Sequence, residues 1–201
     1  MTRMNAYEKL QTARSQTRPT ARSYIEKLFQ ERTELHGDRK YADDAAIIGG
    51  IGMLGDIPAT FIGIERGRNL EERIRCNFGC PMPEGYRKAL RLMRQAEKFH
   101  RPVICFVDTS GAFCGEEAEE RGQGQAIADN LMQMMGLETP IITIVIGAAA
   151  VPWGFPLRIS CICLKMRSFP LFPLRAVQVS SGRMPSLRPM RQNVCILRRR
   201  I

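Results

Sequence analysis

Apolar residues recur along this chain first at helical and then at strand spacing, and the change predicts the order of its elements. Ser23 and Glu26 have the spacing of a capping box, and Gly37 is placed to end a helix, so we predict a first helix between them. Its apolar stripe consists of Tyr24, Ile25, Leu28, Phe29 and Leu35.

Two short apolar runs follow, at residues 45–54 and 57–64. Gly55 and Asp56 lie between them, and such a pair is typical of the tight turn of a β-hairpin. Residues 70–82 mix charged residues with prolines and show no period, so we predict an irregular segment there.

The centre of the chain predicts a strand, a helix and a second, parallel strand. A helix opens at Glu84, and its apolar face consists of Tyr86, Ala89, Leu90, Met93 and Ala96. Residues 103–107 and 141–146 are continuous apolar runs, as in strands buried on both faces of a parallel sheet. Between them lie a glycine-containing loop, residues 108–115, and a third predicted helix, residues 116–135. We therefore predict an α/β fold with a βαβ unit.

The carboxyl ends of the strands are the first place to look for a ligand site, because open α/β sheets bind ligands there. Here those ends are residues 108–115 and Gly147. Glycines in the loop allow backbone N–H groups to face an oxyanion, but a tight strand-to-helix connection needs glycine as well. Ser110 lacks the nucleophile-elbow pattern. Cys114 fits either an activated thiol near a helix N-terminus or a buried, inert cysteine.

Three groups of charged residues each allow two interpretations. The carboxylates of Glu116, Glu117, Glu119 and Glu120 either favour a helix N-terminus or form an acidic contact or a base. A second group either lines a solvated loop or binds phosphate or carboxylate; it consists of Arg66, Arg68, Arg73 and Arg75. A third group either forms a solvated helix face or contacts a nucleotide or coenzyme; it consists of Arg87, Lys88, Arg91 and Arg94.

The composition argues against several classes of protein. No apolar stretch reaches the roughly 18 residues of a transmembrane helix, and residues 1–20 lack the apolar core of a signal peptide. Cys76 and Cys80 have no second cysteine pair at finger spacing, and the chain has 2 His, so we predict no metal in it. We expect the four cysteines that precede residue 148 to be reduced.

The net charge of +10 belongs to the C-terminal segment. All 20 acidic residues precede residue 148, whereas residues 148–201 hold ten of the 30 Lys and Arg. This tail shows no sustained helical or strand period. Read one base out of frame, codons for residues 156–178 can encode V-A-D-K-L-Y-M-L-E-N-A-V-F-S-V-I-S-P-E-G-C-A, which has the acids and apolar runs that the tail lacks. We infer a shift of reading frame within a few codons of Gly147.

The chain therefore divides into three parts. We expect a flexible N-terminus at residues 1–19, a domain at residues 20–147, and an out-of-frame, disordered tail at residues 148–201.

Three stretches of the domain at residues 20–147, which we call the signature stretches, resemble the alpha subunit of the carboxyltransferase of acetyl-coenzyme A carboxylase. They are G-D-R-x-Y-A-D-D from Gly37, R-x-N-F-G-x-P-x-P-E-G-Y-R-K-A-L-R-L-M from Arg75, and D-T-x-G-A-x-x-G from Asp108 with A-E-E-R-G-Q from Ala118. The out-of-frame reading of the tail also contains S-P-E-G-C-A-S-I-L-W-K. This string resembles the same family and supports the frameshift.

The resemblance implies a crotonase- and ClpP-like fold of repeated ββα units, incomplete in this chain. It implies that carboxybiotin on a separate carrier protein gives its carboxyl group to acetyl-coenzyme A, forming malonyl-coenzyme A for fatty acid biosynthesis in the cytoplasm. The implied partners are a zinc-bearing carboxyltransferase beta subunit in a heterotetramer, the biotin carboxyl carrier protein and biotin carboxylase. No association with a membrane is implied.

The resemblance also implies a site built from backbone N–H groups that stabilise the ureido oxygen of biotin. The implied residues are Gly111, Ala112, Gly115 and Gly147 beside biotin, with Arg75, Arg87 and Arg121 as charged contacts. A glycine-rich segment, G-E-G-G-S-G-G-A, is expected after Ile146 to supply oxyanion donors, but Ala148-Ala149-Ala150 follow Gly147 instead. We therefore expect an inactive polypeptide whose catalytic segment is missing. The alternatives are a nucleic-acid-binding protein that uses the tail, or a crotonase-like hydrolase or isomerase.

Overall fold

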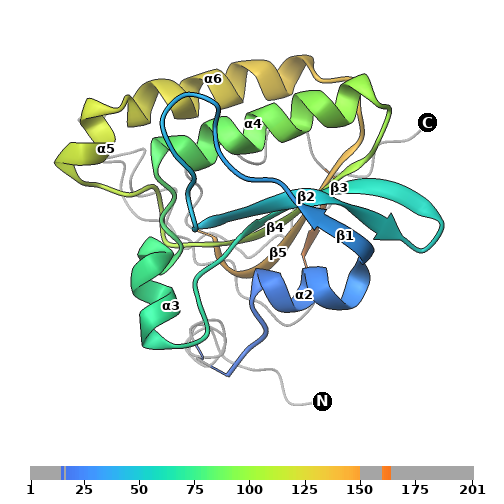
Figure 1. The fold of residues 1–201 in the computed structure, drawn as a ribbon, viewed down its shortest axis with the longest axis horizontal. Coiled ribbons are helices and arrows are strands. Elements are labelled where there is room, and N and C mark those ends of the chain that lie inside the picture. Colours follow the sequence, from blue (N-terminus) through green and yellow to red (C-terminus); the bar gives the residue numbers. More distant parts are fainter. Residues whose placement is uncertain (1–14, 16, 150–159, 164–201) are drawn as a thin grey trace, which may run out of the picture. The chain divides into compact units, whose positions relative to one another are not determined.

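The computed structural model describes residues 15, 17–149 and 160–163, which form a six-stranded sheet with helices on both faces (Figure 1). The strands follow one another across the sheet in sequence order. Three strands pair antiparallel: β1 (Gln30–Glu34), β2 (Ile47–Leu54) and β3 (Ile57–Ile64). Three further strands continue the sheet parallel to β3: β4 (Val103–Thr109), β5 (Ile141–Ala149) and β6 (Ser160–Cys163).

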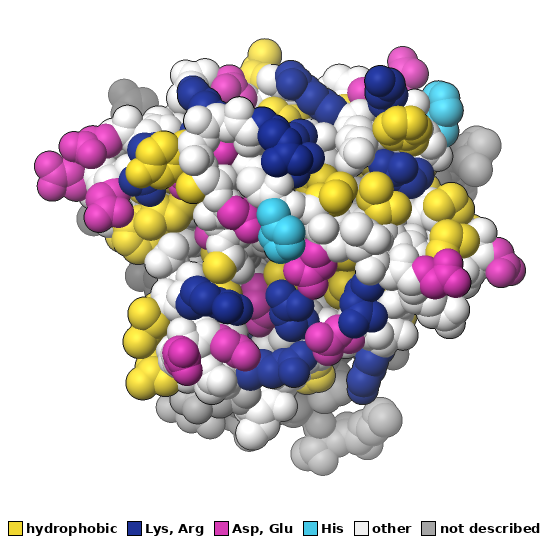
Figure 2. Space-filling model, in the orientation of Figure 1, with side chains coloured by type: hydrophobic (Ala, Val, Ile, Leu, Met, Phe, Trp, Pro, Cys, Tyr) yellow, Lys and Arg dark blue, Asp and Glu magenta, His cyan; other side chains and the backbone are white. Residues whose placement is uncertain are grey.

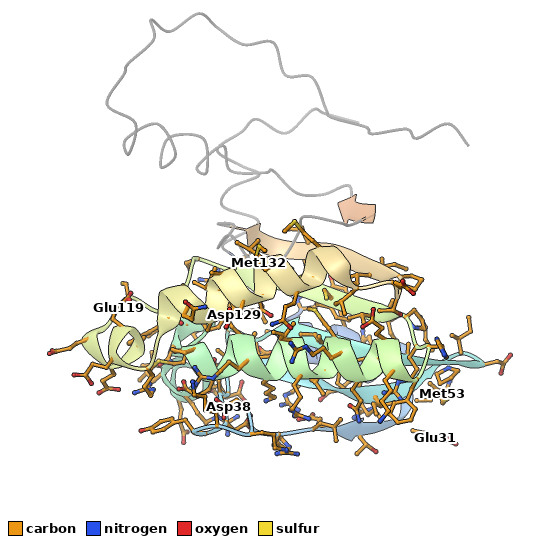
Figure 3. The ribbon with its side chains drawn as sticks, turned by 90° about the horizontal axis from the view of Figure 1, so that it is seen from above. Glu31, Asp38, Met53, Glu119, Asp129 and Met132 are labelled. Carbon is orange, nitrogen blue, oxygen red and sulfur yellow. The ribbon has the colours of Figure 1, made fainter. Side chains whose placement is uncertain are left out.

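Helices cover the two faces unequally. On one face, α4 (Pro83–Lys98) and α6 (Gln123–Gly136) run side by side (Figures 1 and 3). The other face carries α2 (Ala21–Leu28). Shorter helices lie in the connections: α3 (Leu70–Arg75), the 3-10 turn η1 (Asn77–Gly79) and α5 (Glu116–Glu120).

The alternation along β4 separates two apolar cores. Val103, Cys105 and Val107 join the core beneath α4 and α6, whereas Ile104 and Phe106 join the core beneath α2. This is the arrangement of a strand buried on both faces, and it confirms the prediction drawn from the continuous apolar run. The predicted βαβ unit is also confirmed, because β4 and β5 pair in parallel.

Two other predictions from the pattern are confirmed. Leu54 pairs with Ile57 across the hairpin, and Gly55 takes a positive φ of 60° in the turn. The apolar stripe of α4 is buried as expected, and its members are Tyr86, Ala89, Leu90, Met93 and Ala96.

The prediction for the first helix is wrong at both ends. The helix begins after Thr20 and ends at Leu28, and the Ser23 hydroxyl contacts the guanidinium of Arg68 rather than the helix backbone. The following residues form the edge strand β1, because Phe29 leaves the helix and packs on Phe61 with ring centroids 5.1 Å apart. Pairing with β2 therefore overrides the local helical signal.

Two further boundaries differ from the prediction. Residues 70–82, predicted to be irregular, contain α3 and η1, and the Asn69 side chain caps α3 by accepting from the Glu72 N–H at 2.8 Å. The predicted helix over residues 116–135 is two helices, because Gly122 takes a left-handed φ of 80° between α5 and α6.

The predicted N-terminal and C-terminal parts lie mainly outside the described residues. Within residues 1–19, the structure places Arg18 against the ends of β4 and β5. Within residues 148–201, it places residues 148–149 at the end of β5 and residues 160–163 in β6, so these six residues take part in the sheet. The expectations of flexibility and disorder for the remaining residues stay predictions.

The described surface carries charges of both signs. Figure 2 shows Lys and Arg side chains interspersed with Asp and Glu on the face in view, without a broad area of one sign. In the part of the chain that the structure describes, no helix is long and apolar enough to cross a membrane.

Candidate functional site

The first two signature stretches meet at the start of α4, through Asp44. Its carboxylate accepts one hydrogen bond from the Met82 N–H at 2.9 Å and another from the Ala46 N–H at 2.8 Å. Gly85 must be glycine here, because a Cβ would lie 2.3 Å from the Asp44 carboxylate. The Asp44 side chain thus joins the loop after β1 to the helix N-terminus.

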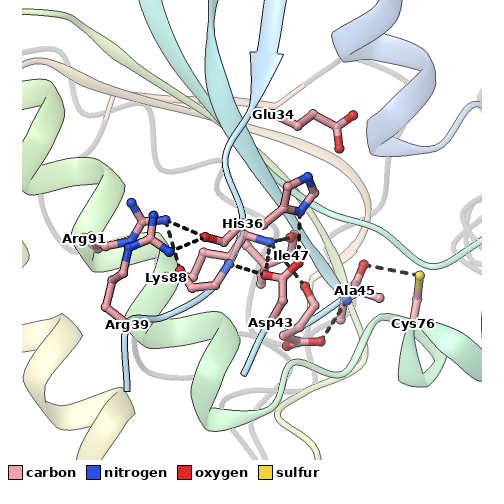
Figure 4. Close-up of polar contacts among 12 residues, drawn as sticks. Glu34, His36, Arg39, Asp43, Ala45, Ile47, Cys76, Lys88 and Arg91 are labelled. Carbon is pink, nitrogen blue, oxygen red and sulfur yellow. Dashed lines mark hydrogen bonds and ion pairs between the residues drawn. The ribbon is translucent and has the colours of Figure 1, made fainter. Parts of the chain in front are cut away.

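Lys88, one turn further along α4, extends this junction (Figure 4). Its ammonium donates to the Asp43 carboxylate at 2.6 Å and to the Ile47 carbonyl at 2.7 Å, and the side chain is only 2 % exposed. Although burial alone would raise the pKa of Asp43, hydrogen bonds from Lys88, Gly37 and His36 lower it. The prediction of a solvated face is therefore wrong for Lys88.

Glu84 joins the second stretch to the third. Its carboxylate, 3 % exposed, pairs with Arg87 at 3.1 Å and with Arg121 at 2.8 Å. Arg87 also pairs with Asp38 at 2.7 Å, so the prediction of a solvated face is wrong for Arg87 as well. The guanidinium of Arg121 lies over the exposed ring of Tyr41, 4.9 Å from its centroid.

The same junction holds the loop that follows β4. The Gln123 amide donates to the Pro81 carbonyl at 2.9 Å and to the Phe113 carbonyl at 3.0 Å, and the Phe113 N–H donates to the Pro81 carbonyl. Thr109 donates its hydroxyl to the Gly79 carbonyl at 2.6 Å. The second and third signature stretches therefore hold this loop directly, and the first holds the start of α4 that supports it.

The ends of β4 and β5 carry a buried charged group. Asp108, 1 % exposed, pairs closely with Arg18 and lies 3.6 Å from the guanidinium of Arg66. Arg18 also donates to the Ile146 carbonyl at 3.2 Å. A Cβ at Gly147 would lie 2.2 Å from Asp108 and 2.4 Å from Arg18, so a larger residue here would displace this ion pair.

The structure brings some predicted site residues together and leaves others apart. Gly111, Ala112 and Gly115 share the loop after β4, and Gly147 lies beside Asp108, where that loop begins. Arg87 and Arg121 meet through Glu84. Arg75 is exposed at the end of α3 and takes no part in that network.

The cysteines give one correction. Cys114 is exposed, so the interpretation as a buried, inert cysteine is wrong for it. Cys76 is buried and donates its thiol to the Ala45 carbonyl, and burial raises its pKa. Among the described residues, no group of three or more His, Cys, Asp or Glu is placed to hold a metal ion.

The sequence did not indicate that Arg18, Asp44 and Lys88 hold distant segments together. Lys88 lies on the side of α4 that carries Ala89 and Leu92, so its place in the helical stripe was a usable signal of burial. Arg18 left no such signal, because its partners lie 90 and 128 residues away in the sequence.

Asp44 makes the stability of this junction depend on pH. Burial raises its pKa to about 6, against the backbone N–H bonds that favour the charged form. Because the folded pKa exceeds the ordinary value, 3.8, this group stabilises the fold fully below about pH 4, and the contribution is lost as the pH rises through about 6.

We therefore expect the stability difference between the wild type and Asp44→Asn to fall by about 2 kcal/mol from pH 4 to pH 7. Urea unfolding across this range measures it, and Asp56→Asn in the exposed hairpin turn is the control. A difference that does not change with pH would show that Asp44 ionises as freely as a solvated carboxyl group.

Comparison with known proteins places the chain in one family. A family model described as acetyl co-enzyme A carboxylase carboxyltransferase-like matches residues 1–153. The acetyl-coenzyme A carboxylase carboxyl transferase subunit alpha of Clostridium perfringens is 63% identical over 143 residues, which are 71% of this chain and 53% of that protein. The protein of the same name from Ruminiclostridium cellulolyticum is 58% identical over 144 residues, 72% of this chain and 55% of its own. The chain thus spans about half the length of these relatives.

Solved structures show the same architecture at low sequence identity. The transcarboxylase 12S structure superposes with a TM-score of 0.53 and 18% identity, over 66% of this chain and 24% of that one. The beta subunit of Pseudomonas aeruginosa geranyl-CoA carboxylase gives a TM-score of 0.51 and 17% identity, over 66% and 23%. The fold is therefore the crotonase-like α/β fold of carboxyltransferases, as predicted. Within that class, the chain belongs to the acetyl co-enzyme A carboxylase carboxyltransferase-like family.

Proposed function

We propose that this chain represents part of an alpha-type carboxyltransferase subunit, whose intact form transfers the carboxyl group of carboxybiotin to acetyl-coenzyme A. The observation that carries the proposal is the convergence of the three signature stretches at the start of α4, beside the loop after β4. Family membership supports the reaction class, because the relatives named above are carboxyl transferase subunits.

In this proposal, backbone groups rather than a nucleophilic side chain serve the reaction. Gly111, Ala112 and Gly115 in the loop after β4, with Gly147 at the end of β5, would lie beside biotin. When bound, carboxybiotin supplies the carboxyl group, and protein N–H groups stabilise the charge that its loss leaves on the ureido oxygen. Arg75, Arg87 and Arg121 are proposed as charged contacts, although the latter two also bind Glu84.

The proposed partners follow from the family. We propose a carboxyltransferase beta subunit in a heterotetramer, the biotin carboxyl carrier protein as the source of carboxybiotin, and biotin carboxylase in the wider cytoplasmic complex for fatty acid biosynthesis. A Clostridium tetani relative, 54% identical over 158 residues, is named as subunits beta/alpha, which supports a close association of the two subunit types.

We further propose that the polypeptide as written is inactive. The family's glycine-rich oxyanion segment is expected after Ile146, where this chain has Gly147 and three alanines. The backbone of β5 continues through Ala149, which lies opposite Thr109 of β4. After a shift in register that follows Val107, this segment stays a strand opposite β4 and does not form a glycine-rich turn, which supports the loss of the oxyanion donors.

The proposed division of the chain has a direct test. We expect limited trypsin digestion to remove the Arg-rich tail early and to leave a fragment that ends at Arg158 or Lys165, the first tryptic sites after Gly147, because the out-of-frame sequence was never selected to pack. Mass spectrometry of the digest identifies the end of the fragment. If the sites at residues 183–200 resist as long as those flanking β4, this division of the chain is wrong.

A further inference from the structure

Two arginines beside the junction, Arg39 and Arg91, have no carboxylate in direct contact among the described residues. Arg39 donates to the His36 carbonyl at 3.0 Å, and Arg91 donates to the same carbonyl at 3.3 Å and to the Gly37 carbonyl at 3.0 Å. Figure 4 shows the two guanidinium groups next to each other, both directed at His36. Among the described residues, neither arginine forms an ion pair, and both donate hydrogen bonds to neutral carbonyl groups.

The nearby carboxylates already have other partners. Asp38 accepts from Arg87 and from three backbone N–H groups, and Asp43 accepts from Lys88 and from the Gly37 N–H and lies 3.0 Å from His36. Burial lowers the pKa of Arg91, and the charge of Arg39 lowers it further, while the charges of Asp43 and Asp38 raise it. The arginines therefore repel each other without a carboxylate between them.

Two features leave this pair ready for an anion. Arg39 is exposed, at a left-handed φ of 68°, so its guanidinium is accessible from solvent while its loop holds it beside α4. The Nε of Arg91 is covered from solvent and has no acceptor among the described residues. A buried donor without an acceptor destabilises the empty arrangement, and a small movement of the side chain toward an anion would relieve it.

We propose that Arg39 and Arg91 form a binding site for a phosphate group, separate from the proposed carboxyl-transfer site. Two planar guanidinium groups present more donors than a single carboxylate can accept, whereas a phosphate dianion offers three acceptor oxygens and a matching charge. The ligand is inorganic phosphate or the phosphate monoester of a nucleotide, and the two sources share this chemistry. The proposal goes beyond the carboxyl transfer and does not depend on it.

Calorimetric titration of the full 201-residue chain tests the site with inorganic phosphate, adenosine 3′,5′-bisphosphate, adenosine and succinate. We expect saturable binding of both phosphate compounds, at about 1 mM or tighter, and weakening as salt is added. Affinity that is tenfold higher for the bisphosphate identifies a nucleotide ester as the ligand, and equal affinity identifies free phosphate. Saturation by adenosine alone, or succinate binding as tight as phosphate, would overturn the assignment.

Matched variants locate the site. Arg39→Gln removes an exposed side chain, and we expect it to weaken phosphate binding on the order of tenfold without changing Tm. Arg39→Lys keeps the charge but loses the planar guanidinium group, so its affinity for phosphate should lie between those of the wild type and Arg39→Gln. Lys98→Gln, exposed on the same helix, should bind as the wild type does. The proposal fails if no binding saturates below about 10 mM, or if Arg39→Gln binds as tightly as the wild type.

Discussion

No measurable malonyl-coenzyme A is expected when this chain is mixed with a cognate beta subunit, carboxylated biotin carrier and acetyl-coenzyme A. A version whose reading frame is restored after Gly147, with the glycine segment present, is expected to be active. Loss of one oxyanion donor typically lowers a rate on the order of 100- to 1,000-fold, and this chain lacks the whole segment. A coupled assay for malonyl-coenzyme A, run on both versions, measures the effect.

The control keeps the restored frame and replaces the glycines of the restored segment by alanine. Its activity should fall toward that of the chain as written, because the backbone can no longer curve around the ureido group. Equal turnover from the written and the restored chains would show that the basic tail is a working part of the protein. An inactive restored version that still folds and binds the beta subunit would instead contradict the proposed function.

Lys88→Met is expected to destabilise the fold by about 3 kcal/mol, the cost of breaking a buried ion pair from one side. Met keeps most of the side-chain volume, so the loss reports the ammonium group. Without it, the Ile47 carbonyl loses a buried hydrogen bond and Asp43 loses its cation. Urea unfolding followed by circular dichroism measures the change in the free energy of unfolding.

Arg94→Gln is the matched control, since Arg94 is exposed on the same helix. Its effect should stay within about 0.5 kcal/mol, as for most surface substitutions. A Lys88→Met loss no larger than that of the control would mean that the junction between the loop after β1 and α4 does not depend on the buried ammonium. Asp43→Asn should cost less than Lys88→Met, because Asp43 is partly exposed and water can replace its partner.

The sequence by itself determined the elements whose signals are local. The turn at Gly55 fixed the hairpin of β2 and β3, and the continuous apolar run of β4 marked a strand buried on both faces. The helical stripe of α4 gave its buried face. In each case the period of the side chains and the geometry of one element suffice, because the pattern of apolar positions records which faces are buried, whatever distant element covers them.

The sequence also indicated where the candidate site lies, because strand ends follow from strand positions. It placed the loop after β4 and Gly147 at the same edge of the sheet, and the structure brings Gly147 beside Asp108. It did not show what holds them. Arg18 reaches this edge from the other end of the domain, and no local pattern reports a contact across 90 residues.

The tertiary structure alone decided the roles of the charged residues and the course of the chain after α2. Residues 30–34 became an edge strand because β2 offers a row of backbone partners, which outweighs a weak helical signal. Lys88 and Arg87 left the solvated face that their charge predicted, because carboxylates from a distant loop compensate their burial. Whether a charge is buried depends on which charges the fold brings to it, and the spacing of residues along one helix does not contain that information.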